Sequence, residues 1–213
     1  MVNYEQKGIL APFTIITSIF TGILFPILGS YLAINLEIIS KPYTEGLILV
    51  IIGGFTAQWL LAHTIHDLYH TKIEKRNTLS QKSLKLLLIF SLIILGAITI
   101  YLMTYRGWII GVFALIGLVV SLYAEGLIHH ESQMAFGAMF LVIGSFYVQV
   151  GTFNLPLLTW LRVVCMGLFA FFSQYGWILF YRLDDYKFGK KIKNRSILIT
   201  KTGLIFLVLY FLF

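Results

Sequence analysis

Charge is scarce in this sequence. Charged residues make up 12% of its 213 residues, about half the share of roughly 25% that is usual in soluble domains. A soluble helical bundle needs polar helix faces, and the long apolar runs of this chain have none. The scarcity argues against a soluble domain and predicts an all-α, polytopic transmembrane bundle.

The sequence also has only one cysteine and lacks glycine motifs of the nucleotide-binding kind. The single cysteine, Cys165, rules out a disulfide within the chain. No phosphate-binding glycine motif is present. Gly53, Gly54 and the other glycines of the apolar runs are therefore predicted to make close helix contacts.

Seven apolar runs are candidate membrane spans, because about 18 consecutive apolar residues suffice to cross a bilayer. The first run has neither a basic lead-in nor a cleavage site of small residues, so we expect a retained span. We treat residues 1–213 as a single membrane domain. The predicted spans are Ile9–Ile34, Gly46–Leu68, Leu84–Met103, Trp108–Ala124, Met134–Val150, Leu155–Tyr181 and Ile197–Phe213.

Basic residues give the expected orientation. They gather after the second and sixth spans, which parity places on one side together with Lys7, whereas the other side has only Lys41 and Arg106. The positive-inside rule then predicts a multi-pass cell-membrane protein with its N-terminus and both basic loops in the cytoplasm. Topology explains the net charge of +7 without a nucleic-acid partner.

Acids are concentrated in the same two loops. The only aspartates are Asp67, Asp184 and Asp185, at the cytoplasmic ends of the second and sixth predicted spans. Charged groups at a membrane boundary are costly unless paired or solvated, and they often mark function. One aspartate alone would suggest simple charge balance with nearby lysines, but all three together favour a functional site.

The stretch HTIHDLYHTKIEKR predicts one polar helix face. If the second span stays helical past Leu68, five ionisable side chains recur at i, i+3, i+4, i+7 and i+11. Acids on such a face suit Mg²⁺, and histidines suit zinc or iron. The alternative is an interfacial helix end whose histidines bind carbonyls and water. The five are His63, His66, Asp67, His70 and Glu74.

The second basic loop echoes the first. KIEKRNTL from Lys72 matches KIKNRSIL from Lys191 at several positions, and an acid lies upstream of each. A genuine repeat implies two related halves with a site between them. Metal-bound diphosphate would then sit between two acidic helix ends, and the basic side chains would hold its phosphate oxygens.

These residues carry a resemblance to a family. His66, Asp67, His70 and Glu74 fit the spacing of an Asn-Asp-x-x-Asp-x-x-x-Asp motif, and Asp185-Tyr-Lys-Phe-Gly189 fits a second Asp-x-x-x-Gly motif. FLVIGSFYVQVGTF, at 140–153, is similar to a fifth span. The chain thus resembles the UbiA-type intramembrane prenyltransferases over nearly its whole length, nearest the 1,4-dihydroxy-2-naphthoate polyprenyltransferase branch of quinone biosynthesis.

The resemblance implies a Mg²⁺-dependent transferase that moves a polyprenyl group from its diphosphate to an aromatic or lipid acceptor. Asp67 and Asp185 would be catalytic. The implied metal ligands are Asp67, His70, Glu74, Asp184 and Asp185. The implied substrate contacts are Arg76, Lys72, Lys190, Lys191, Tyr123 and His66, with His129 and His130 near the acceptor.

Departures from the family pattern leave two other interpretations open. His70 and Glu74 replace aspartates, Tyr181 stands where an aspartate is usual, and seven spans replace nine, which suggests part of a larger bundle. Each carboxylate lost removes a hard ligand for Mg²⁺. One alternative is a degenerate member that binds or assembles without catalysis. The other is a membrane metalloenzyme built on the five histidines. His63 and Gln174 are equally suited to interhelical hydrogen bonds.

Overall fold

The computed structural model describes residues 9–10, 12–74, 79–122, 131–181 and 189–213. This part of the chain is helical and contains no strand. Its elements are α1 (Pro12–Ile19), η2 (Phe20–Leu24), α2 (Phe25–Asn35), α3 (Thr44–Phe55), η3 (Thr56–Ala62), α4 (His63–Glu74), α5 (Gln81–Arg106), α6 (Ile109–Leu122), α7 (Glu131–Val150), α8 (Leu157–Tyr181) and α9 (Lys190–Leu212).

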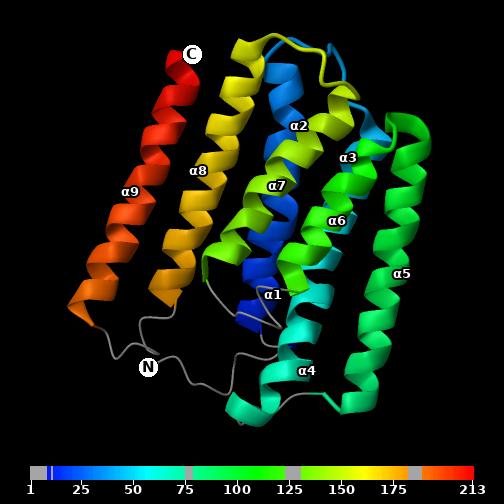
Figure 1. The fold of residues 1–213 in the computed structure, drawn as a ribbon, viewed down its shortest axis with the longest axis vertical. Helices are drawn as coiled ribbons and strands as arrows, with labels where there is room; N and C mark the ends of the chain where they lie inside the picture. Colours follow the sequence, from blue (N-terminus) through cyan, green and yellow to red (C-terminus); the bar gives the residue numbers. More distant parts are fainter. Residues whose placement is uncertain (1–8, 11, 75–78, 123–130, 182–188) are drawn as a thin grey trace.

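The elements join into seven helical rods in the described chain, as predicted (Figure 1). Two π-helical segments, η2 and η3, continue the helices around them, so α1 to α2 form one rod and α3 to α4 another. Five rods are long and apolar enough to cross a membrane; the apolar helices Ile109–Leu122 and Met134–Val150 are shorter. The predicted bundle is confirmed, with five members of spanning length.

Capping residues and glycines set several helix ends, and some of these ends differ from the predicted span boundaries. The Ser80 hydroxyl accepts a hydrogen bond from the Ser83 amide at 3.1 Å, so α5 begins before the predicted span. Gly107 follows α5 with φ +86° and Gly151 follows α7 with φ +70°, conformations that favour glycine. The first helix begins at Pro12 rather than Ile9.

The core lies where α2, α7 and α8 meet. Val142 and Phe146 of α7 and Val163 of α8 are fully buried there. Gly29 of α2 lets that helix approach α7 closely, because an added Cβ would lie 2.1 Å from the Val142 carbonyl oxygen. Close backbone approach at small residues is the usual way in which helices pack within membranes.

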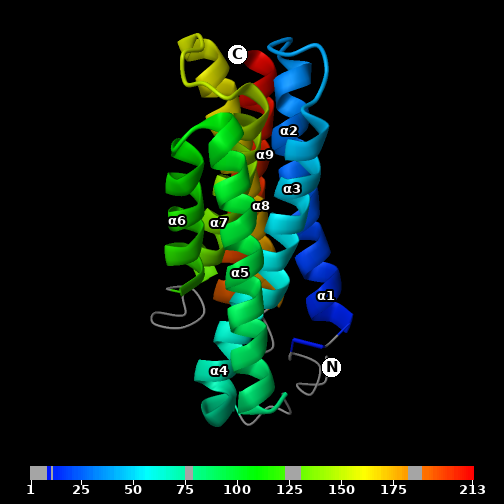
Figure 2. The same ribbon diagram turned by 90° about the vertical axis from the view of Figure 1, so that its right-hand side faces the viewer.

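Burial distinguishes the central helices from the peripheral ones. In the most apolar window of each helix, 61% of α8 is buried, against 11% of α5 and 17% of α9. Figure 2 shows α5 on the outside of the bundle. The apolar side chains on the outer surface of α5, such as Ile93 and Ile100, are exposed. A surface of this kind fits contact with lipid tails.

The helix ends next to the two predicted acidic segments lie at one end of the bundle. The end of α4, the end of α8 and the start of α9 lie at the same end of the molecule as α1 (Figure 1). The chain terminus at Phe213 lies at the opposite end. The parity argument, which placed both acidic segments on one side, agrees with this arrangement.

Candidate functional site

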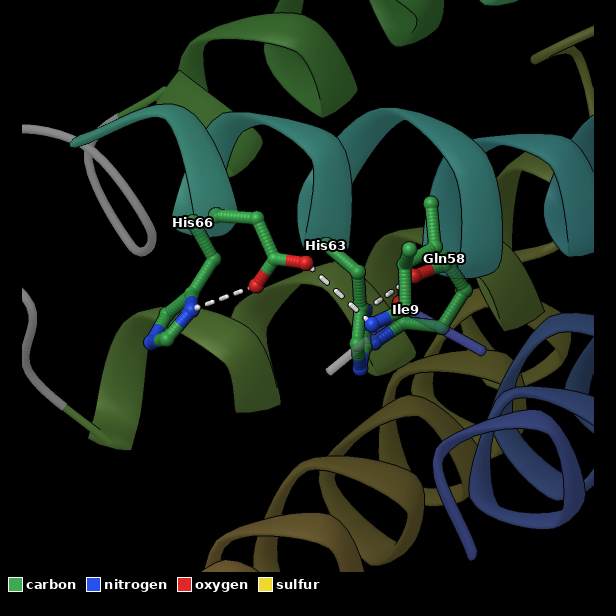
Figure 3. A network of polar contacts seen from close by, with 5 residues as sticks. Ile9, Gln58, His63 and His66 are labelled. Atoms are coloured by element: carbon green, nitrogen blue, oxygen red, sulfur yellow. Dashed lines mark hydrogen bonds and ion pairs between the residues drawn. The ribbon is translucent and has the colours of Figure 1, made fainter. Parts of the chain in front are cut away.

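Asp67 is the centre of the candidate site that the structure describes. It lies on α4, which continues past Leu68 to Glu74 as predicted. Its side chain is only 2% exposed. Its Oδ2 atom accepts a hydrogen bond from the Ile9 amide at 3.2 Å, and its Oδ1 atom lies 3.5 Å from the Nδ1 atom of His66 (Figure 3). A buried carboxylate is thus held at one end of an apolar bundle.

Ile9 is bound at both of its backbone polar groups. Its amide donates to Asp67, and its carbonyl oxygen accepts a hydrogen bond from the Trp59 indole at 2.9 Å. Its own side chain is 2% exposed. Trp59 lies on η3 and stacks on Phe55, with ring centroids 5.1 Å apart. Ile9, which precedes α1, is therefore bonded to the rod that carries Asp67.

The two π-helical segments lie where the first two rods cross. An added Cβ on Gly22 would lie 2.6 Å from the Gly54 carbonyl oxygen, and one on Gly54 would lie 2.3 Å from the Gly22 carbonyl oxygen. Gly22 is in η2, and η3 begins two residues after Gly54. This contact confirms the close helix packing predicted for Gly54, whereas the same prediction is wrong for Gly96 and Gly117, where nothing lies within 4 Å of an added Cβ. Short π-helical turns are frequent at functional sites, and η3 leads directly into α4.

Buried polar side chains accompany Asp67 in the interior. The Thr21 hydroxyl of η2 donates to the Gln174 side-chain oxygen of α8 at 3.0 Å, which confirms the interhelical role predicted for Gln174. The His63 ring lies 3.0 Å, through Nδ1, from the Gln58 carbonyl oxygen. Among the side chains whose burial the structure describes, the buried polar ones of α1, η2, η3, α4 and α8 are Thr14, Ser18, Thr21, Thr56, Thr64, Asp67 and Gln174.

The remaining predicted residues divide into two groups. His70, Lys72 and Glu74 belong to the helical backbone of α4, so the predicted spacing along one helix holds, and Lys190 and Lys191 are exposed at the start of α9. Within the described residues no three His, Cys, Asp or Glu side chains are grouped to hold a metal ion. Arg76, Tyr123, His129, His130, Asp184 and Asp185 lie outside the described residues.

Arg195 has a contact that sequence reasoning missed. Its guanidinium donates to the Tyr175 hydroxyl and lies 5.6 Å from the centroid of that ring. Nearby, the Ser196 hydroxyl donates to the Gly176 carbonyl oxygen at 2.7 Å. These contacts fix the basic start of α9 against α8. From the sequence, Arg195 was interpreted only as one of the basic residues of a predicted cytoplasmic loop. No local sequence pattern links it to Tyr175, 20 residues earlier.

A second polar cluster lies at the opposite end of the bundle. The Arg106 guanidinium lies 4.3 Å from the centroid of the Tyr43 ring. The Gln149 side chain accepts a hydrogen bond from the Tyr43 amide at 2.8 Å and donates to the Tyr43 carbonyl oxygen at 3.3 Å. Burial raises the pKa of the Tyr43 hydroxyl, and the Glu45 carboxylate raises it further. The cluster ties the start of α3 to the ends of α5 and α7.

The fold and the site together define a polytopic α-helical membrane protein with a buried carboxylate at one end of its bundle. No protein-family model matches the chain, and comparisons with curated proteins and with solved structures give no significant match.

Proposed function

We propose that this protein is a membrane prenyltransferase of the UbiA type, which moves a polyprenyl group from its diphosphate to an aromatic or lipid acceptor. The carrying observation is the buried Asp67 carboxylate at the end of the bundle where α4 and α8 end and α9 begins. A carboxylate kept in an apolar bundle is a functional-site hypothesis by default.

The donor chemistry fits a magnesium ion. Asp67 supplies the hard oxygen ligands that Mg²⁺ prefers, and Glu74 follows it by seven residues on the same helix. These two residues, with Asp184 and Asp185, would hold the ion together with the diphosphate. Bound there, Mg²⁺ would stabilise the negative charge that develops on the leaving diphosphate. Lys190 and Lys191, exposed at the start of α9, are suited to the same phosphate oxygens.

The proposed reaction is a substitution at the allylic carbon of the prenyl donor. The bond between that carbon and the diphosphate oxygen breaks, and the electron pair leaves with diphosphate. A carbon or oxygen of the acceptor forms the new bond and loses its proton to water. Aromatic side chains can stabilise a developing allylic cation, and the interior of the bundle offers an apolar environment for the isoprenoid chain.

The test is a membrane assay with labelled polyprenyl diphosphate, Mg²⁺ and a panel of acceptors. Asp67→Asn and Asp185→Asn should each lower turnover by about 100-fold or more, because each removes a charge that acts on the leaving group. Asparagine keeps an acceptor for the Ile9 amide, so the fold should survive at position 67. Glu37→Gln, an exposed acid at the opposite end, is the matched control and should be fully active.

A non-catalytic role is the second candidate, favoured by the hydrogen bond between Asp67 and Ile9. In that case Asp67 would serve to anchor the residues before α1. Wild-type protein would then release no diphosphate with any acceptor, while Asp67→Asn would fold normally. Iron retained through purification, measured by elemental analysis, would instead support the histidine-based metalloenzyme.

A further inference from the structure

We propose that Ile9 and Leu10, the strap segment, act as an autoinhibitory strap on Asp67. The strap segment would have to leave the carboxylate before metal-bound diphosphate could occupy it. This inference rests on the proposed function, because it treats Asp67 as a ligand for that group.

The geometry gives the strap segment a direct hold on the candidate site. The Ile9 amide is bonded to Asp67 and the Ile9 carbonyl to Trp59, residues that lie 58 and 50 positions further along the chain. Both partners belong to the second rod, Trp59 in η3 and Asp67 in α4. The strap segment therefore lies against the side of this rod that carries Asp67, and one of its two hydrogen bonds is to the acid itself.

The strap segment and the carboxylate are buried together. Asp67 and Ile9 are each 2% exposed, so the carboxylate has little contact with solvent in this arrangement. Oδ2 is engaged by the Ile9 amide, and Oδ1 faces His66. A metal ligand must offer free lone pairs. The Ile9 amide therefore occupies acceptor capacity of Oδ2 that a metal ion would otherwise use.

The hold is of a kind that a ligand can displace. Ile9 makes two hydrogen bonds to described residues, one to Asp67 and one to Trp59, and the neighbouring Leu10 is 62% exposed. Charge attraction between a carboxylate and a divalent cation exceeds that between a carboxylate and a neutral amide. The strap segment precedes α1, which begins at Pro12, so its release would also expose the buried Ile9 side chain.

Trp59→Phe tests the strap by removing only the indole donor. Phenylalanine keeps an aromatic ring against Phe55, while the Ile9 carbonyl loses its partner. Magnesium pyrophosphate should bind about 2- to 10-fold more tightly, the change expected for the loss of one competing hydrogen bond. The Ile9 amide should exchange its hydrogen faster than in wild type. Trp108→Phe, at an exposed tryptophan, is the control and should change neither measurement.

Two further measurements keep the test decisive. In wild type, saturating magnesium pyrophosphate should speed hydrogen exchange at the Ile9 amide. A variant lacking residues 2–9 should bind the same ligand more tightly than wild type. If wild type binds but neither variant binds more tightly, and exchange at Ile9 does not respond to the ligand, the strap is refuted while the proposed function stands. If no form binds magnesium pyrophosphate, the proposed function and the strap fall together.

Discussion

Single atoms decide how closely the first two rods can pack. At Gly54 an added Cβ would lie 2.3 Å from a backbone oxygen, which cannot rotate away as a flexible side chain would. At Gly96 on α5, nothing lies within 4 Å of an added Cβ. Both glycines lie inside long apolar helices, so replacing each with alanine changes helix propensity alike and differs mainly in packing.

We expect Gly54→Ala to lower the free energy of unfolding by about 1–3 kcal/mol, the usual cost of overpacking. Gly96→Ala should leave it unchanged to within about 0.5 kcal/mol. Thermal unfolding of both variants in detergent would measure the difference. Equal stability of the two alanine variants would mean that the first two rods do not cross at Gly22 and Gly54.

Two buried threonines, Thr21 and Thr64, allow the contribution of a buried hydrogen bond to stability to be compared with that of an unpaired hydroxyl. Thr21→Val removes the donor to Gln174 and leaves a buried amide oxygen unpaired, which should cost about 0.5–2 kcal/mol. The Thr64 hydroxyl is buried and has no hydrogen-bond partner among the described residues. Thr64→Val, which replaces it with a group of the same shape, should be neutral or stabilising. The unfolding temperature should therefore fall for Thr21→Val. For Thr64→Val it should rise or stay the same.

Whole helices are held together at the end opposite Asp67 by the cluster around Tyr43. Gln149 of α7 binds both backbone groups of Tyr43, and Arg106 at the end of α5 covers its ring. Since Gln149 is 2% exposed, no water can replace its amide. The cluster orients α3, and η3 and α4 continue the same rod. The geometry of Asp67 therefore depends in part on residues at the far end of that rod.

Gln149→Met should detach the start of α3 from α7. The Tyr43 amide would lose its acceptor inside the protein, at a cost of about 1–3 kcal/mol. Hydrogen exchange at the Tyr43 amide should rise together with a fall in the unfolding temperature. Asn194→Met, an exposed amide at the other end, is the control. Unchanged exchange at Tyr43 would show that Gln149 does not hold this end.

The sequence predicted helices better than it predicted their contacts. Apolar runs located each rod, and the spacing from His63 to Glu74 correctly extended the second rod to Glu74. The π-helical segments were not foreseen, because five to seven apolar residues have no period that distinguishes a wide helical turn from an ordinary one. Ile9 was placed inside the first span, since nothing local indicates hydrogen bonds to partners 50 and 58 residues away.

The whole molecule has two chemically different ends. The starts of α5 and α9 carry Lys82, Lys190, Lys191, Lys193 and Arg195 at one end of the bundle. The loops at the other end and the last residue of α5 carry only Lys41 and Arg106, and the Arg106 guanidinium lies over the Tyr43 ring. Asp67 lies toward the basic end. If the positive-inside rule holds, the end that carries Asp67 faces the cytoplasm, and the proposed function requires the diphosphate to enter from that side.

Labelling of single cysteines tests this orientation. Lys41→Cys and Lys193→Cys introduce thiols at exposed positions at opposite ends of the bundle, and Cys165→Ala removes the one native thiol, which is buried. In intact cells a membrane-impermeant maleimide should label Lys41→Cys and not Lys193→Cys, whereas both should react once the membrane is permeabilised. The permeabilised sample is the control for thiol reactivity. Labelling of Lys193→Cys in intact cells would place the basic end, and Asp67 with it, outside the cytoplasm. A cytoplasmic supply of polyprenyl diphosphate could not then reach the proposed site.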